Sequence, residues 1–125
     1  MAVERGSAVI GMALIMLSLI LLHSENTDAA TFKVGDASGW RFGVSNWPNG
    51  KNFTAGDILE FTYTQGMHTV AVVDKNGHDT CTVPSGAQIF RTGNDNVTLV
   101  KGENYFICSV PGHCAMGMQL AINAS

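Results

Sequence analysis

The chain has 125 residues, of which 46% are hydrophobic, and a formal net charge of −3. This length fits one domain, and the charge argues against nucleic-acid binding, because a phosphate-binding surface needs an excess or a stripe of Lys and Arg. We therefore expect no nucleic-acid partner. Three cysteines are an odd number for an exported domain, so one thiol must pair between molecules, stay free or bind a metal.

The N-terminal segment has the pattern of a secretory signal peptide. An apolar run of 14 residues, 9–22, follows a short head that contains Arg5, and small residues at Thr27 and Ala29 suit cleavage after Ala29. The run is shorter than the roughly 18 apolar residues of a membrane span. We place the leader at residues 1–29 and the domain at residues 30–125. The domain carries six basic and seven acidic residues, a net charge of −1, and we expect it to be secreted.

Beyond the leader the sequence predicts an all-β domain. Short runs rich in Val, Ile, Thr and aromatic residues are bounded by Gly, Asn, Asp or Pro, as expected for a Greek-key β-sandwich. The expected strands are 31–34, 58–63, 68–73, 87–91, 97–100, 105–108 and 118–123. The intervening segment 35–50 is dense in turn residues and should wrap the surface with Trp40 and Trp47 turned inward. Residues 74–77 (Asp-Lys-Asn-Gly) are predicted as a hairpin turn, since Asn-Gly accepts positive φ angles.

A candidate metal loop lies near the C-terminus, where Cys108, His113 and Met118 follow one another at intervals of five residues. Pro111 and Gly112 force a turn that folds the later side chains back toward the thiol. Thiolate and imidazole ligands suit copper, and a blue-copper site has two His, one Cys and a weak axial Met. The missing imidazole is assigned to His68, which opens an apolar strand on its core-facing side.

Each of these residues also has a simpler interpretation. His68 could be a core histidine, Cys108 could form a structural disulfide with Cys114 or Cys81, and Met118 could fill the core. A zinc site is disfavoured because its cysteines usually come in pairs two to four residues apart. The simpler interpretations leave the equal spacing and the odd cysteine unexplained, so the mononuclear copper site fits best.

The same residues carry a resemblance that extends over nearly all of the domain. The ligand pattern, together with the segments VGDASGW, WPNGKNFTAGDILEFTY, MHTVAVV, DTCTVPSGA and FICSVPGHCAMGM, resembles the phytocyanins, which are plant blue copper proteins. Within that family it is most similar to the plantacyanins, or basic blue proteins. Met118 stands where a stellacyanin would have Gln. The domain's charge of −1 departs from the basic character that the subgroup's name implies.

The resemblance implies a cupredoxin-type sandwich of about seven strands with short helical segments in its loops. It implies one type 1 copper ion held by His68, Cys108, His113 and Met118, and a disulfide between Cys81 and Cys114. The sequence continues to Ser125 without the Pro- and Ser-rich stalk of anchored members, so we expect no membrane anchor in the mature form.

These features predict a one-electron carrier that cycles between Cu(I) and Cu(II), not an enzyme, because four protein ligands leave no position open for a substrate. Its redox donor and acceptor are unknown, and we expect a monomer located in the extracellular space, the apoplast or cell wall if the source is a plant. The alternative is an extracellular signalling or cell-wall interaction module in which copper is structural or incidental. Sequons make Asn52 and Asn96 candidate glycosylation sites.

Overall fold

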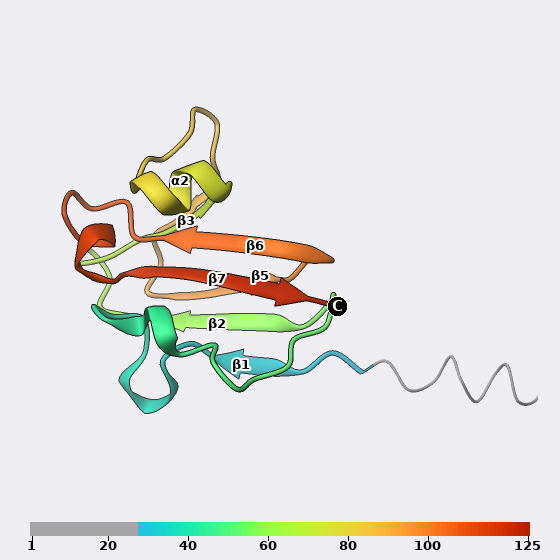
Figure 1. Cartoon of the computed structure of the whole chain (residues 1–125). Coiled ribbons are helices and arrows are strands. Elements are labelled where there is room, and N and C mark those ends of the chain that lie inside the picture. Colours follow the sequence, from blue (N-terminus) through green and yellow to red (C-terminus); the bar gives the residue numbers. More distant parts are fainter. Residues whose placement is uncertain (1–27) are drawn as a thin grey trace, which may run out of the picture.

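The computed structural model describes residues 28–125, which form two β-sheets (Figure 1). The first sheet has the order β1-β2-β5 and the second the order β4-β3-β6-β7. Strands β1 and β2 are parallel, and the other neighbours are antiparallel. The strands are β1 (Thr31–Lys33), β2 (Ile58–Thr62), β3 (Val70–Val73), β4 (Ile89–Phe90), β5 (Asn94–Thr98), β6 (Gly102–Ile107) and β7 (Gln119–Ala124). The predicted seven-strand, all-β fold is confirmed.

The main core lies between the two sheets. Alternating residues of β2 are buried, and Phe61 packs against Phe106 of β6 with ring centroids 5.3 Å apart. Trp40 is 2% exposed and meets Phe61 edge-on, whereas Trp47 is only half-buried at the margin of this core. The wrapping segment therefore turns Trp40 inward as expected, whereas Trp47 is only partly turned inward. It contains the 3-10 helices η1 (Asp36–Ser38) and η2 (Val44–Asn46).

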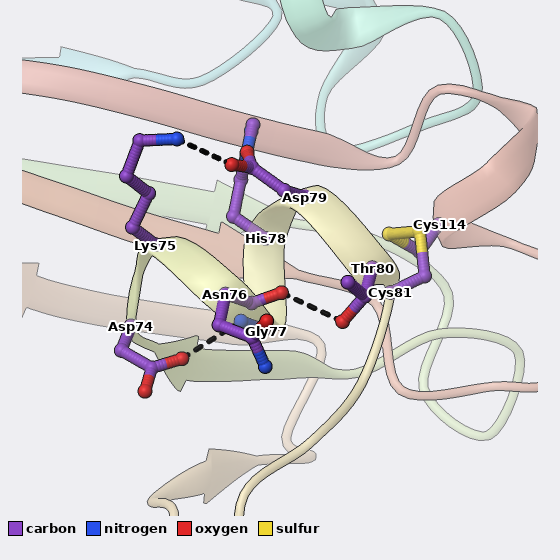
Figure 2. A network of polar contacts seen from close by, with 9 residues as sticks. All are labelled: Asp74, Lys75, Asn76, Gly77, His78, Asp79, Thr80, Cys81 and Cys114. Carbon is purple, nitrogen blue, oxygen red and sulfur yellow. Dashed lines mark hydrogen bonds and ion pairs between the residues drawn. A yellow bond between two sulfur atoms is a disulfide. The ribbon is translucent and has the colours of Figure 1, made fainter.

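The predicted hairpin turn at residues 74–77 is wrong, because this segment begins helix α2 (Lys75–Thr80). Asp74 is the N-cap, and its side chain accepts a hydrogen bond of 2.7 Å from the backbone N–H of Gly77 (Figure 2). Gly77 serves close packing here: a Cβ at this position would come within 2.9 Å of the Cβ of Val73. The Asp-x-x-Gly sequence was therefore a helix cap and not a β-turn.

Three strands are shorter than predicted or shifted. β3 begins at Val70, so His68 lies just before it, and β4 covers only two residues of the predicted run 87–91. β5 begins three residues earlier than predicted, because its backbone pairs with all five residues of β2. Its polar start is stabilised by Asp95, which is 5% exposed and accepts hydrogen bonds from the hydroxyls of Tyr63 and Thr92.

The loops that carry the candidate ligands gather at one end of the sandwich. In Figure 1 the loop after β6 and helix η3 (Cys114–Met116) lie at the end opposite the C-terminus. Strands β1 and β2 both begin at the other end, beside the C-terminus. No helix within residues 28–125 is long and apolar enough to cross a membrane. The predicted leader falls almost wholly outside the described residues.

Candidate metal centre

The imidazoles of His68 and His113 and the thiol of Cys108 converge at this end of the sandwich. One ligand atom of each lies within 4.8 Å of the others, and this is the one group of three or more potential metal ligands of the His, Cys, Asp and Glu types in residues 28–125. The two Nδ1 atoms are 3.0 Å apart, and the Cys108 Sγ is 3.6 Å from His113 Nδ1. Cys108 is the free cysteine and is buried.

The backbone of the loop fixes the positions of Cys108, His113 and Met118 relative to one another. Cys108 directly follows β6, and its N–H donates to the carbonyl of Met118 at 3.0 Å. The N–H of Met118 donates in turn to the carbonyl of His113 at 3.2 Å. The Met118 side chain is fully buried in the main core. The turn predicted at Pro111 and Gly112 is therefore closed by hydrogen bonds between the candidate ligands themselves.

Thr69 ties the segment of His68 to the loop of Cys108, a role that the sequence did not indicate. Its hydroxyl oxygen accepts the N–H of Ser109 at 2.8 Å and lies 2.6 Å from the Ser109 hydroxyl. The same hydroxyl lies 4.0 Å from the Cys108 sulfur. Because Thr69 directly follows His68 and Ser109 directly follows Cys108, these contacts hold the two halves of the centre together.

Two aromatic side chains flank the imidazoles. The ring of Phe42 meets His113 and His68 edge-on, with centroids 4.8 and 5.5 Å apart, and it is 38% exposed. Tyr63 lies near His68, with its ring centroid 6.5 Å from that of His68. Both residues are distant in sequence from the Cys108 loop, and no local motif marks them. Phe42 reaches the site through tertiary packing, whereas Tyr63 lies five residues before His68.

Burial and neighbouring ionisable side chains affect protonation around the centre. Burial, with a smaller contribution from the nearby His113, lowers the pKa of His68 and favours the neutral imidazole that binds metals. Burial and the hydrogen bond to Asp95 raise the pKa of Tyr63 to about 12. Tyr63 therefore remains a neutral phenol beside the site throughout the physiological range.

The predicted disulfide between Cys81 and Cys114 is confirmed. It joins the end of α2 to η3, with the two Cα atoms 5.6 Å apart (Figure 2). Cys81 has the left-handed conformation that ends the helix, with φ of 55°. Cys114 follows His113 directly and is 4% exposed, packed with Ala71 and Ile107. The bridge therefore holds the chain immediately beside one candidate ligand.

The donor set fits a single metal ion. In a tetrahedral site with metal–nitrogen bonds of about 2.0 Å and a metal–sulfur bond of about 2.3 Å, two nitrogens lie about 3.3 Å apart and a nitrogen and the sulfur about 3.5 Å. The observed 3.0 and 3.6 Å are close to these values. Two imidazoles, one thiol and a buried thioether are the donors of a type 1 copper site.

Comparisons with known proteins agree with this chemistry. A family model described as a plastocyanin-like domain matches residues 39–118. Chemocyanin of Lilium longiflorum is 43% identical over 126 residues, which cover 100% of both chains. Basic blue protein of Cucumis sativus is 50% identical over 95 residues, or 76% of this chain and 99% of the relative.

The solved structures include one described as cucumber basic protein, a blue copper protein. It matches with a TM-score of 0.76 and 49% identity, covering 77% of this chain and 100% of that chain. Cucumber stellacyanin matches with a TM-score of 0.68 and 35% identity, covering 78% of this chain and 96% of that chain. With its His, Cys, His and Met side chains gathered at one end of the sandwich, the chain belongs to the phytocyanin family of blue copper proteins, and its site is suited to one type 1 copper ion.

Proposed function

We propose that this protein is a secreted one-electron carrier in which His68, Cys108, His113 and Met118 hold the copper. The observation that carries the proposal is the convergence of two imidazoles on a buried thiol, with their ligand atoms within 4.8 Å of one another. Copper bound there would supply the chemistry, accepting and releasing one electron between Cu(II) and Cu(I). The protein is not an enzyme under this proposal, because four ligands leave no open position for a substrate.

The protein's part is to keep these side chains in place in both oxidation states. Strand β6 and the hydrogen-bonded loop fix Cys108, and Thr69 fixes the neighbouring segment. The disulfide restrains the backbone next to His113. A site that moves little between the two states exchanges electrons with little reorganisation, which is what a carrier requires.

Exposed apolar side chains near the site offer a surface for the redox partners. Among the described residues, the large exposed apolar side chains are Phe42, Met67, Met116 and Val100. The first three lie on segments that reach the centre: Phe42 contacts both imidazoles, Met67 precedes His68 and Met116 belongs to η3. We propose that donor and acceptor approach through this surface.

Secretion is supported by the disulfide, because such bonds persist in oxidising compartments such as the extracellular space. We propose that residues 1–29 are removed on export and that the protein acts as a monomer outside the cell, in the apoplast or cell wall if the source is a plant. Asn52 and Asn96 are both exposed, as glycan attachment requires, and they remain candidate glycosylation sites.

The copper assignment is tested by adding Cu(II) to the protein. We expect an intense blue thiolate-to-copper absorption and a type 1 electron paramagnetic resonance signal with narrow hyperfine splitting. Cys108→Ser and His113→Asn should abolish both, and Met118→Leu should alter them. His78→Asn and Met116→Leu are the matched controls, since they change the same residue types outside the proposed set. Retention of both signals in Cys108→Ser would show that the ligand assignment is wrong.

The carrier role needs its own measurement, because copper binding alone does not establish it. The copper-loaded protein should pass repeatedly between the blue and the colourless state when a small-molecule reductant and oxidant are added in turn. Stopped-flow mixing would give the two rates. Loss of copper or of the disulfide within a few cycles would argue against an electron carrier.

A further inference from the structure

Asp57 is a buried carboxylate at the end of the molecule away from the copper centre. It is 6% exposed and immediately precedes β2. Its Oδ1 accepts a hydrogen bond from the backbone N–H of Ala30 at 3.0 Å, and its Oδ2 accepts one from the N–H of Thr54 at 2.9 Å. Both ion pairs found within residues 28–125 involve Asp79, so Asp57 has only neutral donors.

A carboxylate in this position is unusual, because a buried charge normally has a partner of opposite sign. The copper centre does not explain it, since the site loops lie at the opposite end of the sandwich (Figure 1). A polar but neutral side chain could accept one of the two backbone N–H groups. The carboxylate is therefore suited to a cation that no Lys, Arg or His within residues 28–125 supplies.

The predicted cleavage after Ala29 would create such a cation on an atom already in place. The amide nitrogen of Ala30 would become an α-ammonium group, positively charged at neutral pH because its ordinary pKa is about 8. This nitrogen already lies 3.0 Å from Asp57 Oδ1. Its position is fixed from the other side of the residue, where the carbonyl of Ala30 accepts the N–H of Ile58 at 2.8 Å.

The cavity around Ala30 and Asp57 leaves room for the new N-terminus. Ala30 and Asp57 line a hollow of about 360 Å³, which Asp28 and Thr54 also border. Asp28 is the one other titratable group in this lining, and it departs with the leader. The cucumber basic protein structure matches over 100% of its own length and over 77% of this chain. Residues 30–125 make up the same share of this chain, 96 of 125 residues.

We propose that Asp57 is the receptor for the α-amino group created by processing, and that the resulting ion pair anchors β1 to the sheet in the mature protein. The proposal rests on the secretion and cleavage proposed above. It assigns a role to the N-terminus of the mature chain: the same hydrogen bond becomes a charge-assisted one, which is stronger. Maturation would then stabilise the edge of the β1-β2-β5 sheet without touching the copper ligands.

The test begins with the full chain expressed in a secreting eukaryotic host. Mass spectrometry should identify Ala30 as the first residue of the secreted protein. The rate at which acetic anhydride labels the α-amine, followed in the N-terminal peptide across pH, then gives the pKa of this group. We expect that pKa to rise by at least about one unit, so that labelling near pH 7 is roughly tenfold slower than in the same protein denatured. Asp57→Asn should restore the fast rate.

A second form covers the case in which Asp57→Asn fails to fold. A secreted chain that retains Ala29 keeps a neutral amide at Ala30, the arrangement that the structure already contains. Its α-amine should be labelled as fast as in the denatured protein. The form starting at Ala30 should in addition lose thermal stability above pH 8, because a raised pKa contributes stability that disappears as the pH rises through it. The form that retains Ala29 should lose less.

The outcomes separate this inference from the proposed function. Equal labelling rates in the folded and denatured Ala30 form would overturn the ion pair, and a secreted protein starting at another residue would overturn the assigned cleavage. In either case the blue copper spectrum, recorded on the same sample, would stand. Retention of the chain inside the cell would instead contradict the proposed secretion.

Discussion

The disulfide between Cys81 and Cys114 should account for a large part of the stability of the metal-free protein. It joins residues separated by 33 positions and so closes a loop of 34 residues that includes β4, β5, β6 and Cys108. The chain-entropy model assigns about 4 kcal/mol to a loop of this length, because the bridge restricts the unfolded chain. Removing it should lower the melting temperature by roughly 15–30 °C, at about 4–8 °C per kcal/mol for a domain of this size.

Cys81→Ala is the appropriate change, because the Cys81 residue is exposed while Cys114 is packed in the interior. It opens the bridge and leaves the buried sulfur in place, so the loss should come from the unfolded chain. The double variant Cys81→Ala/Cys114→Ala should lose about 1 kcal/mol more, since it also leaves a small cavity beside Ala71 and Ile107.

Denaturant unfolding of the metal-free proteins, with reductant added to the variants to keep their thiols free, measures both losses. Working without copper matters, because a metal that binds only the folded state would add stability of its own. A loss of less than about 1.5 kcal/mol in Cys81→Ala would refute the reasoning from loop entropy. A loss confined to the double variant would assign the effect to packing around Cys114 instead.

Three further predictions concern the surroundings of the site. Gly117→Ala should destabilise the protein by more than about 2 kcal/mol and weaken copper binding, because the φ of Gly117 is +92° and a Cβ would come within 2.8 Å of the backbone nitrogen of Gly43. Gly112→Ala is the control, because Gly112 has a similar φ of +82° but open space around it. In the same denaturant assay it should lower the free energy of unfolding by only about 1 kcal/mol. Thr69→Val should lower the unfolding free energy by about 1–3 kcal/mol because it leaves the Ser109 N–H without its acceptor, whereas Thr69→Ser should restore most of it. In the Tyr105→Phe variant, the phenolate absorbance should report Tyr63 alone and titrate near pH 12. The free energy of unfolding should fall between pH 10 and 12, because the tyrosine of the unfolded chain ionises first. Titration near pH 10 would contradict the argument that burial raises this pKa.

The loop of candidate ligands could be predicted because its information is local. Cys108, His113 and Met118 lie within eleven residues, and the turn between them has its own sequence signature. The hydrogen bonds from Cys108 to Met118 and from Met118 to His113 close the loop as that pattern indicates. The strands could be predicted from their composition because that signal is also local.

The residues that the sequence did not reveal act through contacts between distant segments. Phe42 reaches both imidazoles from the wrapping segment, and Tyr63 pairs with Asp95 of the neighbouring strand. Neither contact has a local signature. The hairpin at Asp74 failed for a different reason: Asp and Gly favour both turns and helix caps, and packing of Gly77 against the sheet decided between them.

The position of His68 shows how strand register completes the site. Ala71 faces Ile107 across the antiparallel β3-β6 pair, so continuing the register by two residues sets Thr69 opposite Ser109. The ladder ends before that point, yet side-chain bonds of 2.6 and 2.8 Å continue the alignment between the two segments. His68 is therefore brought beside the Cys108 loop by the pairing of β3 with β6, although it lies outside the strand. The sequence can suggest that a histidine 40 residues before Cys108 is a ligand, but only this strand pairing places the two residues next to each other.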